Sequence, residues 1–328
     1  MLPTIINEKQ IRELCPLNQA ALQAVAGGFI ALSEGITQVP PIMRIDFPTV
    51  NGEIDVKTAV VDGWDSFAIK MASGFFENQK LGLPNSSGLM LVFSTISGEC
   101  QAILLDQGYL TDVRTGLAGA LAANVLAPQN PIVGVIGSGI QSRYQIKCLR
   151  LVRAFNELHV YGTDSQGAGI YAQEMREELG LKVTIYPNPQ AVVQSCNLLV
   201  TTTPARNAYL KAKWLHPGLH ITCMGSDAPH KQELDAKVFQ HTDIIVCDSR
   251  IQCANLGEIH HALKAGVLTD LTHVHELGEI LSGHIPGRIS EEQITICDLT
   301  GVGVQDTSIA RFVLQQFHNL PTIGVTNE

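Results

Sequence analysis

From about residue 131 onward, short apolar runs alternate with helical or turn segments. The runs are PIVGVIG, ELHVYG, LKVTIYP, NLLVTTT, LHITCMG and DIIVCDS, and a later one is ITICDL. They are apolar throughout rather than at every second residue, which is typical of strands in a sheet covered by helices on both faces. The alternation therefore predicts βαβ units and a parallel sheet.

The first of these runs leads into a glycine pair. The segment PIVGVIGSGIQSRYQIKCLRLVRAF predicts a strand, a turn with Gly137 and Gly139, and a long helix, which is the context of a dinucleotide-binding loop. Gly137 would allow the tight turn, and Gly139 would let a pyrophosphate approach the backbone. The amides from Ile140 and Gln141 onward would face the phosphates. A plain strand–turn–helix is the alternative, since Ser142 stands where a third glycine is usual, but the βαβ units that follow favour dinucleotide binding.

The end of the second run bears on the type of dinucleotide. An acid about 20 residues beyond the glycine loop usually binds the ribose 2′-hydroxyl of NAD. Here Gly162 occupies that place, and the nearest carboxylate is Asp164, which could instead cap the next helix. No Lys or Arg occurs in residues 162–175 to pair with the 2′-phosphate of NADP. The sequence favours NAD(H) and leaves NADP(H) open.

The first third of the chain has a different pattern. Residues 17–35 predict a helix closed by Gly35. The runs IDVKTAVV, SFAIKMAS, GLMLVFST and CQAILLD are rich in β-branched residues and bounded by Gly, Asn and Asp, which predicts an antiparallel or mixed sheet. Residues 115–127 predict a connecting helix of small residues, and the tail segment SIARFVLQQFHNL predicts an amphipathic helix that returns to the first domain.

Composition and charge exclude several kinds of partner. With 328 residues, two domains are expected. The 22 Lys and Arg against 31 Asp and Glu give a net charge of −9, which argues against nucleic acid or an anionic membrane surface. No apolar run is long enough to span a bilayer, and no signal-peptide pattern opens the chain. The eight cysteines form no CxxC pair and the histidines show no ligand spacing, so a cytoplasmic protein without a metal is expected.

Four stretches together resemble the ornithine cyclodeaminase/μ-crystallin family: LTDVRTGLAGALAANVLA, VGVIGSGIQSR, NLLVTTTP and MGSDAPHKQELD. The resemblance covers nearly the whole chain. It implies an α/β fold with a Rossmann-type dinucleotide-binding domain at residues 119–305. A second α/β domain, for substrate binding and dimerisation, would comprise residues 1–118 and 306–328, and the protein would be a homodimer.

The resemblance also implies roles for particular residues. Arg44, Lys70 and Arg114 fall where the family binds the substrate carboxylate, and Lys70 and Asp227 fall on its catalytic positions, with Asp227 as acid/base. The residue types suit this chemistry, because an Arg fork matches a carboxylate and a carboxyl group can protonate an imine nitrogen. Lys70 lies in an apolar run, where an unpaired ammonium would be costly. The predicted cofactor-binding set is Arg114, Thr115, Gly137, Gly139, Ile140, Gln141, Asp164, Thr202, Thr203 and Met224.

Within the family, the segment 55–90 and the stretch LLDQGYLTDVRTG are most similar to the ectoine-utilisation and iminosuccinate-reductase branch. This implies an NAD(H)-dependent reductase or dehydrogenase that acts on a small α-imino or α-amino acid. Three alternatives stay open: a cyclodeaminase that recycles NAD+ within each turnover, a pyrroline-2-carboxylate reductase, and a crystallin-like protein that binds ligands without catalysis.

The substrate's far end is predicted from one position. Ornithine cyclodeaminases have a glutamate thirteen residues before the active-site lysine, which helps to bind the distal ammonium. Lys57 stands at that place here, and a cation would favour a distal carboxylate, as in the reduction of iminosuccinate to aspartate. The alternative is that Lys57 points to solvent, because successive strand residues face opposite sides.

Overall fold

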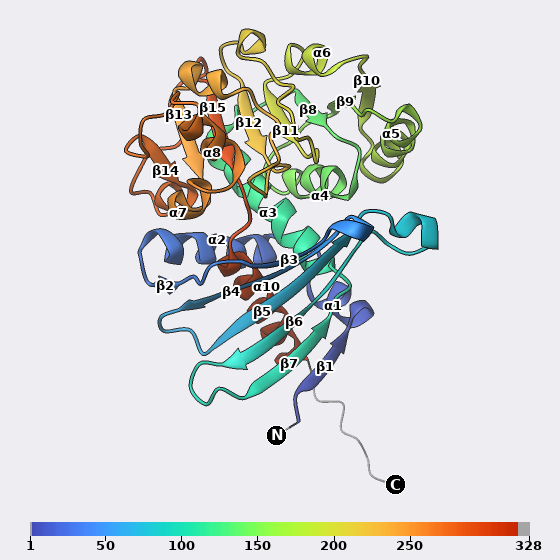
Figure 1. The fold of residues 1–328 in the computed structure, drawn as a ribbon, viewed down its shortest axis with the longest axis vertical. Coiled ribbons are helices and arrows are strands. Elements are labelled where there is room, and N and C mark those ends of the chain that lie inside the picture. Colours follow the sequence, from blue (N-terminus) through green and yellow to red (C-terminus); the bar gives the residue numbers. More distant parts are fainter. Residues whose placement is uncertain (1, 321–328) are drawn as a thin grey trace. The chain divides into compact units, whose positions relative to one another are not determined.

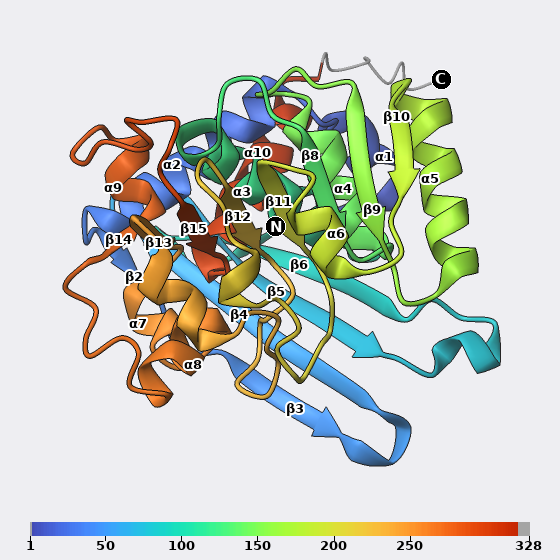
Figure 2. The same cartoon turned by 90° about the horizontal axis from the view of Figure 1, so that it is seen from above.

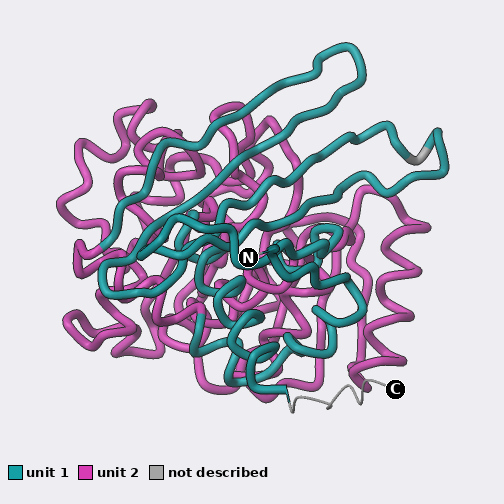
Figure 3. Tube along the Cα trace, turned by 90° about the horizontal axis from the view of Figure 1, so that it is seen from below, with its two compact units in different colours: residues 1–24, 37–111, 303–328 teal, residues 25–36, 112–302 magenta. Residues whose placement is uncertain are grey.

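The computed structural model describes residues 2–320, which form two compact units (Figure 3). Unit 1 comprises residues 1–24, 37–111 and 303–328, and unit 2 comprises residues 25–36 and 112–302. The domain boundaries expected at residues 118 and 306 stay a prediction, and the end of the expected first domain, residues 321–328, lies outside the described residues.

Unit 1 is built on a mixed sheet with the order β1-β7-β6-β5-β4-β2, in which β3 also pairs with β4 (Figure 1). Strands β1 and β7 are parallel and the other neighbours are antiparallel. The four predicted runs form β4 to β7, whereas the shorter β1, β2 and β3 were not predicted. The strands are β1 Thr4–Asn7, β2 Thr37–Gln38, β3 Met43–Phe47, β4 Gly52–Val61, β5 Ser66–Phe75, β6 Ser86–Ser94 and β7 Cys100–Leu105.

The last helix, α10 (Gly303–His318), packs on β4, β5 and β6 of this sheet. It begins five residues before the predicted segment, at Gly303, where a Cβ would overlap the backbone of Thr58. The hydroxyl of Thr307 accepts from the Ala68 N–H at 3.1 Å and donates to the Ala59 carbonyl at 2.7 Å. The remaining helical segments of unit 1 are α1 Glu8–Leu14, η1 Pro48–Val50 and η2 Asn78–Leu81.

Unit 2 contains a parallel eight-stranded sheet with the order β10-β9-β8-β11-β12-β15-β13-β14 (Figure 2). The seven predicted strands are present, and the three-residue β14 was not predicted. The strands are β8 Val133–Ile136, β9 Glu157–Tyr161, β10 Lys182–Ile185, β11 Leu198–Thr201, β12 His220–Cys223, β13 Ile244–Cys247, β14 Val274–Glu276 and β15 Thr295–Asp298.

Helices and two apolar clusters cover the sheet of unit 2. Helix α2 (Gln19–Ser33) and helix α3 (Tyr109–Leu126) begin in unit 1 and end in unit 2. The others are α4 Ile140–Leu149, α5 Ser165–Leu179, α6 Pro189–Val193, α7 Arg250–Cys253, α8 Gly257–Lys264, α9 Leu277–Leu281, η3 Ala212–Trp214 and η4 Ala236–His241.

The predicted fold class, α/β with a Rossmann-type dinucleotide-binding domain, is confirmed. The strand order of unit 2 runs outward in both directions from β8 and β11, so the chain crosses over between these two strands. Such a switch point opens a crevice at the carboxyl ends of the strands, where α/β proteins bind ligands. No helix among the described residues is both long enough and apolar enough to cross a membrane.

Candidate functional site

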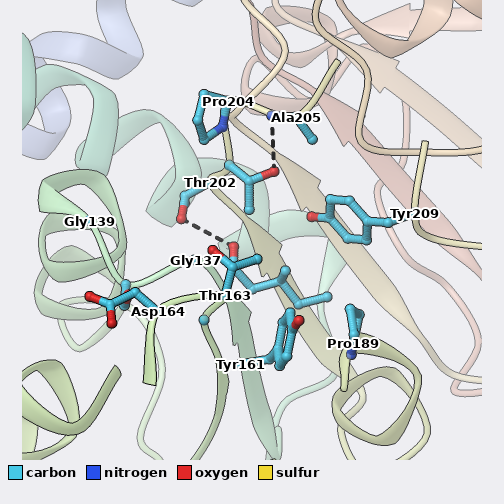
Figure 4. A pocket seen from close by; sticks show the side chains of 14 residues that line it. Gly137, Gly139, Tyr161, Thr163, Asp164, Pro189, Thr202, Pro204, Ala205 and Tyr209 are labelled. Atoms are coloured by element: carbon cyan, nitrogen blue, oxygen red, sulfur yellow. Dashed lines mark hydrogen bonds between the residues drawn. The ribbon is translucent and has the colours of Figure 1, made fainter. Parts of the chain in front are cut away.

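A pocket of about 420 Å³ lies at this switch point in unit 2 (Figure 4). Three loops supply most of its lining, and each follows the carboxyl end of a central strand: β8, β9 or β11. The lining residues are Ile136, Gly137, Ser138, Gly139, Tyr161, Gly162, Thr163, Asp164, Pro189, Thr202, Thr203, Pro204, Ala205 and Tyr209. Five predicted cofactor residues are among them: Gly137, Gly139, Asp164, Thr202 and Thr203.

The two glycines of the loop after β8 differ in what they require. Gly137 has φ +116°, and a Cβ there would overlap the hydroxyl of Thr202. Gly139 has φ −83° and is the N-cap of α4. A Cβ at Gly139 would meet no described atom within 4 Å beyond its immediate neighbours, because it would enter open space. The first glycine therefore shapes the turn, and the second leaves room beside the N-terminus of the helix.

Ser142, at the place of the usual third glycine, is fully buried. Its hydroxyl donates to the Gly139 carbonyl at 2.7 Å, and its own carbonyl accepts from the Tyr171 hydroxyl at 3.3 Å. The serine is thus accommodated in the first turn of α4 with its polar group satisfied.

Asp164 fulfils both alternatives that the sequence left open: it lines the pocket and it caps a helix. It lines the pocket after β9, and it is also the N-cap of α5. Its Oδ1 accepts from the Gln166 N–H at 3.0 Å and its Oδ2 from the Gly167 N–H at 2.9 Å. Each carboxylate oxygen has a second lone pair. The cap therefore orients the carboxylate at the pocket edge without using up its capacity to accept a further hydrogen bond.

Glu233 forms hydrogen bonds with the part of the pocket lining that follows β11, and sequence analysis did not identify this residue. Glu233 is fully buried and accepts hydrogen bonds from Thr201, Thr203, Tyr209 and Gly225. Burial raises the pKa of this carboxyl, and the hydroxyl and backbone donors act in the opposite direction. Its position ten residues into the stretch MGSDAPHKQELD, among polar neighbours, gave no sign of burial.

Unit 2 has three more buried acids: Glu258 in the first turn of α8, Asp298 at the end of β15 and Asp248 directly after β13. Glu258 accepts from the backbone N–H groups of Glu233 and Leu234, and burial raises its pKa well above the usual value. Burial raises the pKa of Asp298 to about 8. Asp248 accepts from the Gly301 N–H at 2.7 Å, and burial raises its pKa too.

Asp227, the predicted acid/base, follows β12 in the loop that also carries Lys231. The Lys231 Nζ lies 2.6 Å from the Asp227 Oδ1. The Asp227 side chain is 44% exposed and that of Lys231 is 12% exposed. Ser226 donates to the Lys231 carbonyl at 2.6 Å, which fixes the turn between the two charged residues. Asp227 is therefore accessible and forms an ion pair with Lys231.

The other predicted residues of unit 2 lie outside the lining of the pocket. Gln141 donates from Nε2 to the Asp112 carboxylate at 2.7 Å, and the Thr115 carbonyl accepts from Gln145 at 2.9 Å. Arg114 is buried on α3, with its guanidinium against Gly301 in the loop after β15. Ile140 begins α4 and is 48% exposed, and Met224 directly follows β12.

The predicted substrate residues of unit 1 share one face of the sheet. Lys57 on β4 is directly opposite Lys70 on β5, so the two side chains point to the same side. Lys70 forms an ion pair of 3.0 Å with Asp306 on α10, and both side chains are buried. Lys57 is 7% exposed, which contradicts the alternative that it points to solvent. Asp306 was not identified from the sequence.

Arg44 on β3 forms ion pairs with carboxylates of the β3–β4 hairpin. It is the register partner of Asp55, whose carboxylate lies 3.7 Å from Nη1. It also forms ion pairs with Glu53 and, at 3.2 Å, with Asp46. The side chain of Arg44 is 22% exposed. A substrate carboxylate that bound here would have to share or displace these partners.

Comparison with known proteins gives relatives along the whole chain. A dehydrogenase by name from Rhizobium meliloti is 44% identical over 325 residues, which cover 99% of this chain and 98% of the relative. A cyclodeaminase by name from Sinorhizobium fredii is 43% identical over 319 residues, which cover 96% of each. The names of these two relatives therefore point to two different reactions.

Solved structures of similar proteins carry nicotinamide cofactors. An archaeal alanine dehydrogenase, described as a dimer with bound NAD, has a TM-score of 0.87 and 31% identity and covers 96% of each chain. The pyrroline-2-carboxylate reductase of Thermococcus litoralis, solved with NADH and L-proline, has a TM-score of 0.89 at 26% identity and covers 95% of this chain and 97% of its own. The iminosuccinate reductase of Paracoccus denitrificans, solved with NAD+, has a TM-score of 0.87 at 27% identity and covers 96% of each chain.

These relatives are dehydrogenases, reductases and a cyclodeaminase by name, in agreement with the prediction of an enzyme that uses NAD(H). The family model for ornithine cyclodeaminase/mu-crystallin matches residues 3–319. The predicted membership is thus confirmed: the chain belongs to the ornithine cyclodeaminase/mu-crystallin family.

Proposed function

We propose that this protein is an NAD(H)-dependent reductase or dehydrogenase of a small α-imino or α-amino acid. The observation that carries the proposal is the pocket at the switch point, where Gly139 leaves open space at the N-terminus of α4. A helix N-terminus with free amides favours an anion, and the missing Cβ lets a pyrophosphate come close. The relatives solved with NAD, NADH and NAD+ support the same cofactor.

The pocket fits NAD better than NADP. Asp164 at its edge can accept from a ribose 2′-hydroxyl, whereas its charge would repel a 2′-phosphate. No Lys or Arg occurs among the described residues that line the pocket. We therefore expect a higher kcat/KM with NADH than with NADPH, and Asp164→Ser should reduce that ratio while it keeps a side chain that can cap α5. A preference of the wild-type protein for NADPH would contradict this assignment.

Asp227 is the proposed acid/base. When bound, the nicotinamide supplies or accepts the hydride at the substrate's α-carbon. The Asp227 carboxyl would then donate the proton to the imine nitrogen, or accept it from the amine in the reverse direction. The exposed fraction of its side chain, 44%, leaves the carboxyl group open to a substrate, and the contact with Lys231 orients it. Asp227→Asn should fold and bind NADH but lose about 10²–10⁴-fold in turnover. Turnover near the wild-type level would remove Asp227 from the mechanism.

Arg44, Lys57, Lys70 and Arg114 are the proposed substrate-binding residues, and Lys57 is the proposed determinant of specificity. Lys57 and Lys70 form a buried pair of cations on one face, so a substrate with a second carboxylate would find a second positive partner. We propose iminosuccinate, which yields aspartate on reduction.

The test compares imines that differ only at the distal end, with NADH consumption as the readout. Lys57→Glu should raise the KM for iminosuccinate, and Lys57→Met, the matched control that removes the charge without inverting it, should have a smaller effect. Release of ammonia from ornithine without net change in NADH would favour a cyclodeaminase instead and would contradict the proposed substrate.

We also propose a homodimer formed through the face of the unit 1 sheet opposite α10. Because Lys70 points toward α10, its strand neighbours Ile69 and Met71 point to the opposite face. There Ile69 pairs with Leu91 across the strands, and Phe67 stacks on Phe93 with 5.7 Å between ring centroids. These side chains are only half buried, which is unusual for a contiguous apolar face. Light scattering should give twice the chain mass, and Ile69→Lys should give the monomer.

A further inference from the structure

We propose that Glu233 is a positioning residue for the cofactor: its buried carboxylate fixes the pocket wall between the ends of β11 and β12. Glu233 is not among the residues that line the pocket. It acts through Thr203 and Tyr209, which do line it. The inference rests on the proposed binding of NAD(H) in this pocket and adds a residue to which neither the glycine loop nor the family motifs assign a role.

The carboxylate joins three separate segments of unit 2. Its Oε1 accepts from the Thr203 N–H and hydroxyl, both at 2.7 Å, and from the Tyr209 hydroxyl at 2.9 Å. Its Oε2 accepts from the Thr201 hydroxyl at 2.7 Å and from the Gly225 N–H at 3.0 Å. One side chain thus ties the end of β11, the segment with Tyr209 and the loop after β12, in which Asp227 lies two residues beyond Gly225.

The backbone closes tightly around this carboxylate. A Cβ at Gly225 would overlap the Thr203 carbonyl and would lie 2.5 Å from the Glu233 Oε2. Glu233 is itself anchored, since Glu258 accepts from its N–H at 2.7 Å and from the Leu234 N–H at 3.0 Å. The position of Thr203 in the wall therefore depends on a carboxylate that has no freedom to move with a flexible loop.

The donor set requires a carboxylate rather than an amide. Hydroxyl donors such as those of Thr201 and Tyr209 can rotate and become acceptors, but a backbone N–H cannot. Each Glu233 oxygen accepts from one backbone N–H, Oε1 from Thr203 and Oε2 from Gly225. In Glu233→Gln, either orientation of the amide places its NH2 group against one of these two N–H groups. One strand end must then shift or leave a buried donor unsatisfied.

The experiment measures NADH binding by fluorescence titration, and steady-state KM and kcat, for the wild-type protein, Glu233→Gln and a matched control. Asp298→Asn is the control, because it makes the same acid-to-amide change at a buried carboxyl of unit 2. The Asp298 carboxyl accepts from the Ile259 N–H at 2.9 Å, and neither residue lines the pocket. The pKa of Asp298 is raised to about 8, so its carboxyl is already largely neutral at pH 7 and the amide is a close mimic.

We expect Glu233→Gln to weaken NADH binding by about tenfold or more, since one buried N–H loses its acceptor. Its KM for NADH should rise by the same factor, while kcat at saturating NADH changes by less than about threefold. Asp298→Asn should keep the wild-type affinity within about twofold. If Glu233 only stabilised the fold, Glu233→Gln would not change KM for NADH without also changing kcat, and the two variants would behave alike.

Three results would overturn the inference: wild-type affinity in a folded Glu233→Gln, an equal loss in both variants, or a loss confined to kcat. If Glu233→Gln does not fold, Thr201→Val decides, because it removes one donor to Oε2 and does not touch the pocket. Weaker NADH binding in that variant supports the role of Glu233, and unchanged binding refutes it. A wild-type protein that binds no NADH would refute the proposed function itself. Failure of the proposed function is thereby distinguished from failure of the inference about Glu233.

Discussion

The two glycines of the loop after β8 should respond in opposite ways to the same substitution. In Gly137→Ala the alanine must adopt φ +116°, which L-residues rarely do, and its methyl group overlaps the Thr202 hydroxyl. The backbone strain costs about 1–3 kcal/mol and the overlap adds about 1–3 kcal/mol. The free energy of unfolding of unit 2 should therefore fall by about 2–6 kcal/mol, whether or not a cofactor is present.

In Gly139→Ala the backbone conformation is allowed for any residue, and the methyl group enters open space. The lower entropy of the unfolded chain and the poorer N-cap each change stability by less than about 1 kcal/mol and act in opposite directions. The methyl group would, however, occupy the place where a pyrophosphate approaches α4. A steric cost of about 1–3 kcal/mol in the complex corresponds to about 5–150-fold weaker NADH binding.

The assay pairs urea denaturation, followed by circular dichroism, with a fluorescence titration of NADH. The double variant Gly137→Ala/Thr202→Ala serves as a control, since it removes the overlapping hydroxyl and should recover part of the lost stability. NADH bound with full affinity by Gly139→Ala would refute the assignment of the phosphate position. A Gly137→Ala protein as stable as wild type would show that the turn does not need its left-handed conformation.

Two further predictions concern buried charges. Asp306→Asn should lower the free energy of unfolding by about 3–5 kcal/mol, because it leaves the buried Lys70 ammonium without the carboxylate at 3.0 Å. The double variant Lys70→Met/Asp306→Leu removes both charges and should cost less than Asp306→Asn alone. Both are measured by urea denaturation, and additive losses would argue against coupling between the two residues. The pKa of His220 is lowered to about 3, mainly by burial, so only the unfolded chain takes up its proton as the pH falls below about 6.5. Stability should thus drop by about 2 kcal/mol more between pH 8 and pH 5 in the wild-type protein than in His220→Gln, and equal drops would count against the lowered pKa.

The parts of the fold that sequence analysis predicted are those whose signal is local. Strands β8, β9, β11, β12, β13 and β15 are buried on both faces and so appear as continuous apolar runs. Strand β14, with the sequence VHE, and the two-residue β2 have too few residues for any periodicity. Their pairing is set by the neighbouring strand, and a sequence pattern does not contain that information.

The orientation of Lys57 shows what a pairing register adds. The spacing of thirteen residues to Lys70 left its direction open. Strand β4 ends at Val61 and β5 begins at Ser66, and this short turn sets the two lysines directly opposite each other. Directly opposed residues share a face, so the two cations must be neighbours. The separate register of β3 against β4 places Arg44 opposite Asp55, a pairing that no motif could have predicted.

The stretch GSDAPHKQELD contains three carboxylates, and the environments of two of them, Asp227 and Glu233, differ in burial and in hydrogen bonding. Asp227 is 44% exposed and forms an ion pair with Lys231, which leaves it the access that the proposed acid/base role needs. Glu233 is fully buried and accepts five hydrogen bonds, three at Oε1 and two at Oε2, so a proton on either oxygen would compete with donors that already occupy it. An acid that exchanges protons in every turnover needs access to the substrate and few fixed hydrogen-bond donors. An acid that positions the lining of a pocket needs burial and many fixed donors. A motif match weights both residues equally, whereas burial and the hydrogen-bond donors around each carboxylate differ, and this difference is the ground for proposing a chemical role for Asp227 and a positioning role for Glu233.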